Sequence, residues 1–429
     1  MLSRRTILVG LVVMTGCVPR APTSAPTNAV ATDAPLPTVT PVDFTSSPTP
    51  KDTAIARRVC PIHELESAPE FYESGVVVFA NMTGQMLGTD SDLYSLSVPE
   101  MTLQPFLADL SRGIFTDFRV SPEGKWLAFV HEKLDGQHML GHDLILATSH
   151  PEDRKSVPWD EKSWAYDLNG WTTDGKGLLI TPRFSDDMRP PERPDAIIIL
   201  DPFTGRQQRM SLLFPNAGSF YPDYWKQVGM SAVYAPTLNH VAYLEDGQAV
   251  VLWDIKNLRE VWRFTDSQLA EIEVPTWSPD GQILTLVELD PKGAVLSQRS
   301  SFRFLFISVN GEVSRSTALP YFAGLNPHVG WSPDSRYLYL VWTAGDNEPV
   351  TLLLWDTVAQ EFIDYCLDDV TGPVWSPDSR QFVVRAAVPS ESSGGQGGYQ
   401  DLLVYVEQGR VLELNTTPLD PVAWLRGTP

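Results

Sequence analysis

Short apolar segments alternate along the chain with clusters of Pro, Gly, Asp and Ser. The apolar segments are rich in Val, Ile, Leu and aromatic residues, as in GVVVFA at 75–80 and AVVLWD at 249–254. Runs of this length, bounded by turn residues and rich in β-branched side chains, are typical of buried strands rather than of helices. The pattern therefore predicts an all-β protein.

One motif recurs through the chain and introduces many of these segments. Its copies are VSPEGKWLAFV at 120–130, WTTDGKGLLIT at 171–181, WSPDGQILTLV at 277–287, WSPDSRYLYLV at 331–341 and WSPDSRQFVV at 375–384, with a degenerate copy, YAPTLNHVAYL, at 234–244. Self-similarity at a spacing on the order of 40–60 residues is the signature of a propeller or solenoid. The motif thus predicts a repeat architecture made of strands.

The centre of the motif is a turn sequence. Pro presets φ, Asp bonds the local backbone and Gly accepts a positive φ, so Ser-Pro-Asp-Gly joins two strands in a tight hairpin. Ser335 and Ser379 replace this Gly in two copies, where we expect slight backbone strain. The aromatic residue before the turn supplies an apolar plate for packing between sheets. We interpret the motif as structural rather than catalytic.

Each motif is followed by a second predicted hairpin, and two hairpins make one four-stranded blade. The second strands of the blades are expected to begin near seven positions: Val76, Lys125, Gly177, His240, Gln282, Tyr337 and Gln381. The first blade has no motif strand before it, and PVAWLRG from Pro421 supplies the missing inner strand from the other end of the chain. We predict a seven-bladed β-propeller closed by its C-terminal strand, with six blades as the alternative if the degenerate copy is an insertion.

The turn motifs and the apolar strands that follow them resemble the TolB-like propeller repeats over roughly residues 70–429. Trp253-Asp254 and Trp355-Asp356 also resemble WD-repeat blades, although the Gly-His half of that signature is absent. The resemblance implies the propeller fold. It does not carry over the partners of TolB, because TolB has an N-terminal α/β domain where this chain has a different N-terminal region.

The first residues read MLSRRTILVGLVVMTGC, with a basic pair, a short apolar run and small residues before Cys17. This order is that of a secretory signal peptide, and the apolar run is shorter than the roughly 20 residues needed to span a bilayer. Small residues directly before Cys17 resemble the lipobox of bacterial lipoproteins, which implies that Cys17 carries the lipid. Arg4-Arg5 also resembles a twin-arginine signal, so the export route, general secretory or twin-arginine, stays open.

Pro, Thr, Ala and Ser dominate the segment after Cys17 and cannot bury enough apolar area to offset the entropy of ordering. We therefore predict three regions: a lipoprotein signal peptide at 1–16, a lipid-anchored disordered linker at 17–58 and the propeller at 59–429. The expected location is outside the cytoplasm. The lipid would lie in the outer face of the cytoplasmic membrane, or in a periplasmic or outer-membrane leaflet.

The formal net charge of −21 makes nucleic acid an unexpected partner, because like charges repel. It favours cations or basic patches of a cell-envelope protein or extracellular ligand. We expect the body to be water-soluble and monomeric, and we expect no cofactor beyond a cation at a structural or ligand site.

Cysteine and histidine offer two further candidates. After Cys17 only Cys60 and Cys366 remain, and an oxidising compartment would permit a disulfide between them; two buried thiols are the alternative. His131, His138 and His142 fall in one predicted blade and form a weak candidate for zinc or copper, with solvated loop histidines as the stronger expectation.

Acidic residues recur before the predicted inner strands, which start at one face beside the channel of a propeller. If the blade register is right, side chains from separate blades converge there into a cation or ligand site. The alternative is that they stabilise local turns. The candidate residues are Asp117, Asp167, Glu273, His328, Asp369 and Asp420.

The leading functional hypothesis is a non-enzymatic binding or scaffold module. The sequence contains no G-x-S-x-G nucleophile motif and no phosphate-binding Gly-rich loop. The alternative is a hydrolase or lyase acting on an envelope or extracellular glycan or peptide through carboxylates at the channel mouth.

Overall fold

The structure is a computed structural model in which the chain divides into two units, Met1–Thr53 and Ala54–Pro429. Only the second unit contains described residues, so the predicted signal peptide, Cys17 and most of the predicted linker lie outside the described part. The residues described are 56–60, 72, 74–81, 92–98, 100–110, 113–135, 138–157, 165–183, 196–211, 232–245, 249–265, 275–289, 300–321, 328–343, 349–388, 398–414 and 419–427.

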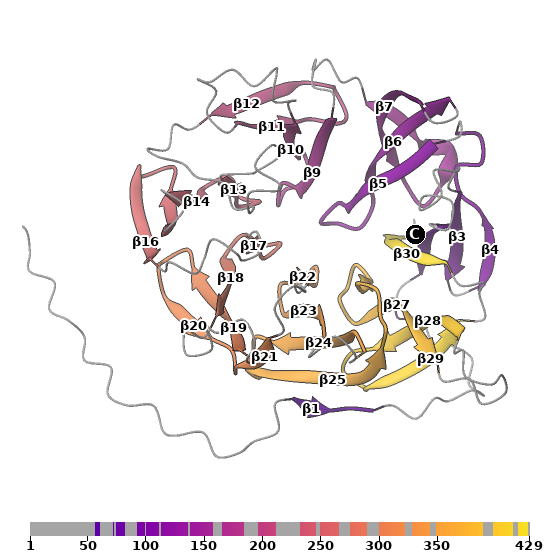
Figure 1. Cartoon of the computed structure of the whole chain (residues 1–429). Coiled ribbons are helices and arrows are strands. Elements are labelled where there is room, and N and C mark those ends of the chain that lie inside the picture. Colours follow the sequence, from indigo (N-terminus) through magenta and orange to yellow (C-terminus); the bar gives the residue numbers. More distant parts are fainter. Residues whose placement is uncertain are drawn as a thin grey trace, which may run out of the picture. The chain divides into compact units, whose positions relative to one another are not determined.

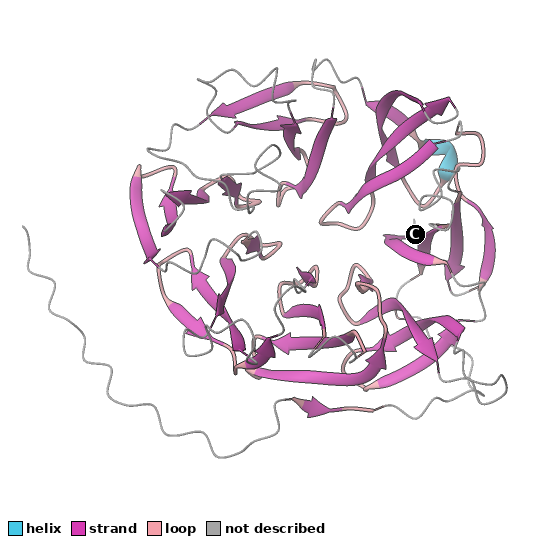
Figure 2. Cartoon of the chain, viewed as in Figure 1, coloured by secondary structure: helices cyan, strands magenta, loops and turns pink. Residues whose placement is uncertain are grey.

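Strands make up nearly all of the described structure, as Figure 2 shows. Within the described ranges the single helical element is a 3-10 turn, η2 (Pro151–Asp153). None of the described helical structure is long and apolar enough to cross a membrane. The expectation of an all-β protein is confirmed.

The first three sheets are four-stranded and antiparallel. The first has the order β30 (Asp420–Arg426), β2 (Gly75–Ala80), β3 (Leu93–Val98) and β4 (Thr102–Pro105). The second contains β5 (Gly113–Val120), β6 (Leu127–Asp135), β7 (His138–Ala147) and β8 (Lys155–Val157). The third contains β9 (Ala165–Trp171), β10 (Leu178–Arg183), β11 (Ala196–Leu200) and β12 (Gln207–Ser211).

The remaining sheets continue this order. The fourth contains β13 (Ala232–Tyr234), β14 (His240–Glu245), β15 (Ala249–Asp254) and β16 (Arg259–Thr265). The fifth contains β17 (Thr276–Trp277), β18 (Ile283–Leu289), β19 (Ser300–Ser308) and β20 (Val313–Arg315), with β21 (Leu319–Tyr321) also paired to β19. The last is a nine-stranded sheet of β22 (His328–Trp331), β23 (Tyr337–Trp342), β24 (Thr351–Asp356), β25 (Glu361–Asp368), β26 (Val374–Trp375), β27 (Gln381–Val388), β28 (Gly398–Tyr405), β29 (Arg410–Leu414) and β1 (Arg57–Arg58).

These sheets are the blades of a β-propeller, and the C-terminal strand closes the first blade as predicted. Strand β30 pairs antiparallel with β2, with Ala423 opposite Val78. In Figure 1 the yellow β30 lies against the purple strands of the first blade. Within the nine-stranded sheet the two four-stranded halves are joined by the bridge between Asp368 and Ala387, so the number of blades, six or seven, stays a prediction.

The core lies between neighbouring sheets, which explains the continuous apolar strands. In β2, Val78 packs in one cluster with Phe115 of the second sheet, whereas Val77 packs in another with Val383 of the last sheet. All six residues of β2 are buried, because both faces of this strand are covered. Burying such a side chain contributes about 1.5–3 kcal/mol, so a strand without polar alternation is the expected solution.

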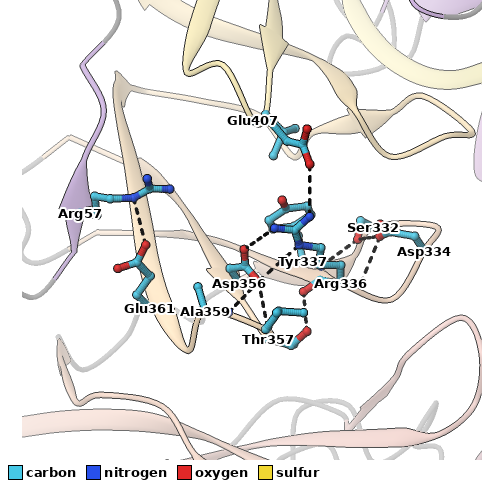
Figure 3. Close-up of polar contacts among 12 residues, drawn as sticks. Arg57, Ser332, Asp334, Arg336, Tyr337, Asp356, Thr357, Ala359, Glu361 and Glu407 are labelled. Carbon is cyan, nitrogen blue, oxygen red and sulfur yellow. Dashed lines mark hydrogen bonds and ion pairs between the residues drawn. The ribbon is translucent and has the colours of Figure 1, made fainter.

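The recurrent motif forms the turns that follow the inner strands β5, β9, β13, β17, β22 and β26. In the copy drawn in Figure 3, Ser332 Oγ donates to Asp334 Oδ1 at 2.6 Å, and the Tyr337 N–H donates to Ser332 Oγ at 2.9 Å. The Arg336 N–H donates to the same carboxylate oxygen at 3.1 Å. Ser335 takes a φ of 63°, in the left-handed region that favours Gly. The turn is therefore closed by side chains within the motif.

Successive copies of the turn are also bonded to one another. The Asp280 N–H donates to Ser335 Oγ at 3.1 Å, and the Asp334 N–H donates to Ser379 Oγ at 3.0 Å. Ser335 and Ser379 are the two residues that replace Gly, with φ of 63° and 60°. The strain expected from the sequence is present, and the hydroxyl that accompanies it supplies an acceptor to the adjacent blade.

Arg336, in the turn between β22 and β23, forms ion pairs with two carboxylates. Arg336 Nη2 contacts Asp356 Oδ2 at 3.0 Å in its own blade, and Arg336 Nη1 contacts Glu407 Oε1 at 3.3 Å after β28 (Figure 3). The Asp356 carboxylate, as hydrogen-bond acceptor, raises the pKa of the Arg336 guanidinium. The two halves of the nine-stranded sheet are thus connected by charge as well as by backbone.

Replacing Ser335 tests the bond between turns. Ser335→Ala keeps the left-handed backbone and removes the acceptor, so we expect a loss of about 1 kcal/mol in the free energy of unfolding. Ser335→Gly also removes the acceptor but relieves the backbone, which is worth about 1 kcal/mol, so this variant should be close to wild type. Urea unfolding of the three proteins measures the difference. An alanine variant as stable as the glycine variant would contradict the role assigned to backbone strain.

Candidate functional site

Two of the predicted carboxylates open into one pocket of about 350 Å³. The pocket lies where the two halves of the nine-stranded sheet meet β30, and its lining residues come from five places in the chain. They are Val350, Asp369, Val370, Thr371, Arg385, Tyr399 and Asp420. Val350 precedes β24, Asp369 follows β25, Arg385 and Tyr399 stand in β27 and β28, and Asp420 begins β30.

Arg385 is the central cation of this pocket. Arg385 Nη1 donates to Asp420 Oδ1 at 3.0 Å, an ion pair between β27 and the strand that closes the first blade. The two side chains are 22% and 26% exposed, so water reaches the pair without fully screening it. The Arg385 guanidinium also lies 5.0 Å from the centre of the Tyr399 ring. Arg385 thereby fixes one wall of the pocket.

The backbone of Arg385 is fixed as well. Its N–H donates to Thr371 Oγ1 at 3.2 Å, and the Thr371 N–H donates to the Arg385 carbonyl oxygen at 2.9 Å. Thr371 follows the segment that leaves β25, so these two bonds hold that segment beside β27. Two of the lining residues, Thr371 and Arg385, are therefore bonded directly to each other.

Asp369, another lining residue, has a left-handed backbone with a φ of 47°. Its Oδ1 accepts a hydrogen bond from the Val350 N–H at 3.3 Å. Within the described part of the chain, the second oxygen of Asp369 and the second oxygen of Asp420 accept no hydrogen bond. Two carboxylate oxygens thus remain available to a ligand.

The neighbouring residue Asp368 has a shifted pKa. Desolvation, followed by the negative charges of Asp369 and Asp364, raises the pKa of the Asp368 carboxyl, and the Arg58 guanidinium opposes that rise. The field around the end of β25 is therefore negative, which favours cations.

Among the other predicted carboxylates, the structure describes only the side chain of Asp117, which does not line this pocket. Asp117 stands in β5, where its Oδ2 accepts a hydrogen bond from the Leu168 N–H of β9 at 3.4 Å, so this side chain links two inner strands. Asp167 lies in β9 opposite Thr181, and its side chain is outside the described residues. Glu273 also lies outside the described residues. Of the six candidates, the structure places Asp369 and Asp420 in one pocket.

His328 begins β22 and is exposed, with its ring 5.7 Å from that of Tyr339. Partial desolvation of the imidazole, and then the positive charge of Arg119, lower the pKa of His328. A histidine with a lowered pKa is neutral near neutral pH, so His328 adds no charge to a cation site there.

The three histidines considered for a metal do not converge. His131 in β6 pairs with Asp143 of β7, and the next pair, Glu132 with His142, points to the opposite face of the sheet. His131 is 1% exposed and stacks on Phe115, so the expectation of a solvated loop residue is wrong for it: this position faces the core. The His138 side chain is outside the described residues. In the described part of the chain no three His, Cys, Asp or Glu residues are grouped so that they could hold a metal ion.

Comparisons with known proteins give structural likenesses alone. No known protein family and no curated protein matches the chain. TolB from Acinetobacter baumannii aligns with a TM-score of 0.42 at 15% identity over 82% of this chain, which spans 66% of the TolB chain. The propeller domain of Cps50 (Swd1) from Myceliophteria thermophila gives 0.41 at 13% identity over 81% of this chain and 97% of its own. An oligogalacturonate lyase in complex with manganese gives 0.41 at 13% identity over 72% and 75%. Likenesses at this level carry no argument about function.

The raised pKa of Asp368 yields a prediction about pH. A carboxyl whose pKa is higher in the folded than in the unfolded state favours folding when protonated and loses that contribution as the pH rises through the folded value. Asp368→Asn keeps the side chain neutral, so we expect a higher unfolding temperature near neutral pH and no gain well below the ordinary pKa of 3.8. Thermal unfolding at both pH values checks this. Asp153→Asn, in the exposed turn η2, is the matched control, and an equal gain there would contradict the explanation.

Proposed function

We propose that the chain is a non-enzymatic binding module, exported and lipid-anchored through Cys17, whose propeller holds a ligand in the pocket between β25, β27, β28 and β30. The observation that carries the proposal is that Asp369 and Asp420, far apart in sequence, open into one pocket with Arg385, which pairs with Asp420. Convergent polar groups in a preformed concave site are the usual form of a ligand site.

The charge of the pocket selects a ligand with a cationic group. Two carboxylates and one guanidinium line it, which leaves one negative charge in excess. The protein as a whole carries −21, so the long-range field also draws cations toward the surface. An ammonium group can contact the available carboxylate oxygens of Asp369 and Asp420.

The apolar part of the lining suits an aliphatic stem. Val350 and Val370 line the pocket beside the carboxylates, and Tyr399 is 48% exposed. An exposed tyrosine ring attracts ammonium groups through its π face. A polyamine, or a lysine side chain of an envelope protein or an extracellular peptide, combines the two features. The occupant proposed is therefore a primary amine on an apolar chain.

Calorimetric titration of the propeller with spermidine and with an Nα-acetyl-lysine amide tests this proposal. We expect saturable binding that weakens as salt is added. Asp369→Asn removes one carboxylate charge and should weaken binding by at least about tenfold, equivalent to 1.4 kcal/mol. Asp153→Asn makes the same charge change in the exposed turn η2 and should leave binding unchanged.

Two results would contradict the proposal. If neither amine binds, the pocket does not hold the proposed ligand. If Asp153→Asn weakens binding as much as Asp369→Asn, the effect is one of overall charge and the pocket is not the site. Turnover of a glycan or peptide panel by the wild-type protein would replace the binding module by the hydrolase or lyase alternative.

The lipid anchor is tested in cells. Globomycin blocks removal of lipoprotein signal peptides, so treated cells should accumulate a heavier precursor of this protein, and Cys17→Ser should abolish incorporation of labelled lipid. Processing that continues unchanged in globomycin would show ordinary secretory cleavage instead.

A further inference from the structure

The first strand of the propeller unit is a strap along the outer edge of β25. Arg57 and Arg58 of β1 pair in parallel with Ile363 and Asp364. The strap, residues 57–60, continues with the Val59 N–H donating to the Asp364 carbonyl oxygen at 2.8 Å. It ends in a disulfide between Cys60 and Cys366, whose Cα atoms are 5.1 Å apart.

Side chains of the strap also contact the blade. Arg57 Nε contacts Glu361 Oε1 at 3.0 Å, the ion pair drawn at the left of Figure 3. Val59 packs against the core cluster of the nine-stranded sheet and fits against Gly409, where an added Cβ would lie 2.1 Å from Val59 Cγ1. The close approach needs Gly at position 409, so the surface of the blade is complementary in shape to the Val59 side chain of the strap.

The strap reaches the strained end of β25. Cys366 has a φ of 56° and Asp369 a φ of 47°, two left-handed non-Gly residues within four positions. Asp364 Oδ1 accepts a hydrogen bond from the Cys366 N–H at 2.7 Å, and Asp364 Oδ2 contacts Arg58 Nε at 3.2 Å. Such backbone persists only where surrounding contacts hold it.

The same backbone carries the pocket. Asp369 lies three residues after Cys366 and lines the pocket, as does Thr371, which is bonded to Arg385. The disulfide and the Arg58–Asp364 contact therefore hold the start of the segment that presents the Asp369 carboxylate. Breaking the disulfide removes one of those contacts without touching a lining residue.

We propose that the Cys60–Cys366 disulfide controls the affinity of the pocket for its amine ligand, oxidised protein binding more tightly than reduced protein. The inference rests on the proposed function and adds its regulation. The reductant is a dithiol: its two thiols become one disulfide, and the two electrons and two protons they release break the Cys60–Cys366 bond into two thiols. Reduction removes the covalent link to Cys366 and leaves β1 held by two ion pairs and short backbone pairing, so the bend that leads to Asp369 is held less firmly from the outer edge.

Spermidine titration of oxidised and dithiothreitol-reduced wild-type protein is the experiment. We expect reduction to weaken binding at least about fivefold, the lower limit of typical coupling between two sites. Cys60→Ala should bind like the reduced protein and should not respond to dithiothreitol. Circular dichroism of each sample confirms that the sheets remain, so that a loss of binding reports the pocket rather than unfolding.

The outcomes separate the two proposals. Equal affinity of oxidised and reduced protein overturns the switch and leaves the binding function in place. A dithiothreitol effect of the same size in Cys60→Ala also overturns it, because the disulfide is then not the target. Failure of the oxidised wild-type protein to bind any amine overturns the proposed function itself.

Discussion

In three copies of the turn motif, a buried hydroxyl at the start of the turn satisfies polar groups that would otherwise be unpaired between the sheets. Ser278, Ser332 and Ser376 are fully buried, and each donates to the Asp two positions later while accepting the N–H five positions later. Leaving such groups unpaired costs about 1–3 kcal/mol each. Because the hydroxyl fixes the turn, the inner strand ends at a defined point, and the next residues can bond to the adjacent blade.

That constraint acts at one end of the inner strands and leaves the other end free to vary. The turn at Ser376 follows β26, whereas Asp369 precedes it, and Asp420 likewise stands at the beginning of β30. Ring closure needs no particular side chain at that beginning. Charged residues at the beginning of the strand therefore do not disturb the turns. The pocket lies at this end of the inner strands, where the motif does not constrain the sequence.

The sequence was sufficient for the strands, the turns and the closure by β30, because each depends on local chemistry that repeats. It also singled out Asp369, which precedes the inner strand β26, and Asp420, the first residue of β30, and the structure places both in the lining of one pocket. It missed Arg385 and Tyr399, whose position beside Asp420 depends on which blades become neighbours. A signal was present for Arg385, the single charged residue in the apolar strand Gln381–Val388. Asp117 does not line the pocket, because its carboxylate accepts a hydrogen bond from the backbone of the next blade.

The backbone bridge between Asp368 and Ala387 explains why the pocket and the strap lie at the same part of the chain. Strand β25 is eight residues long and crosses toward the next blade, where the inner strand β26 has only two residues. The chain must bend sharply to return inward, and the left-handed residues Cys366 and Asp369 make that bend. Each such residue costs about 1–3 kcal/mol, which the disulfide and the ion pairs of β1 offset from the outer edge. The bend that opens the pocket is thus held from outside the blade, so the strap belongs to the construction of the site.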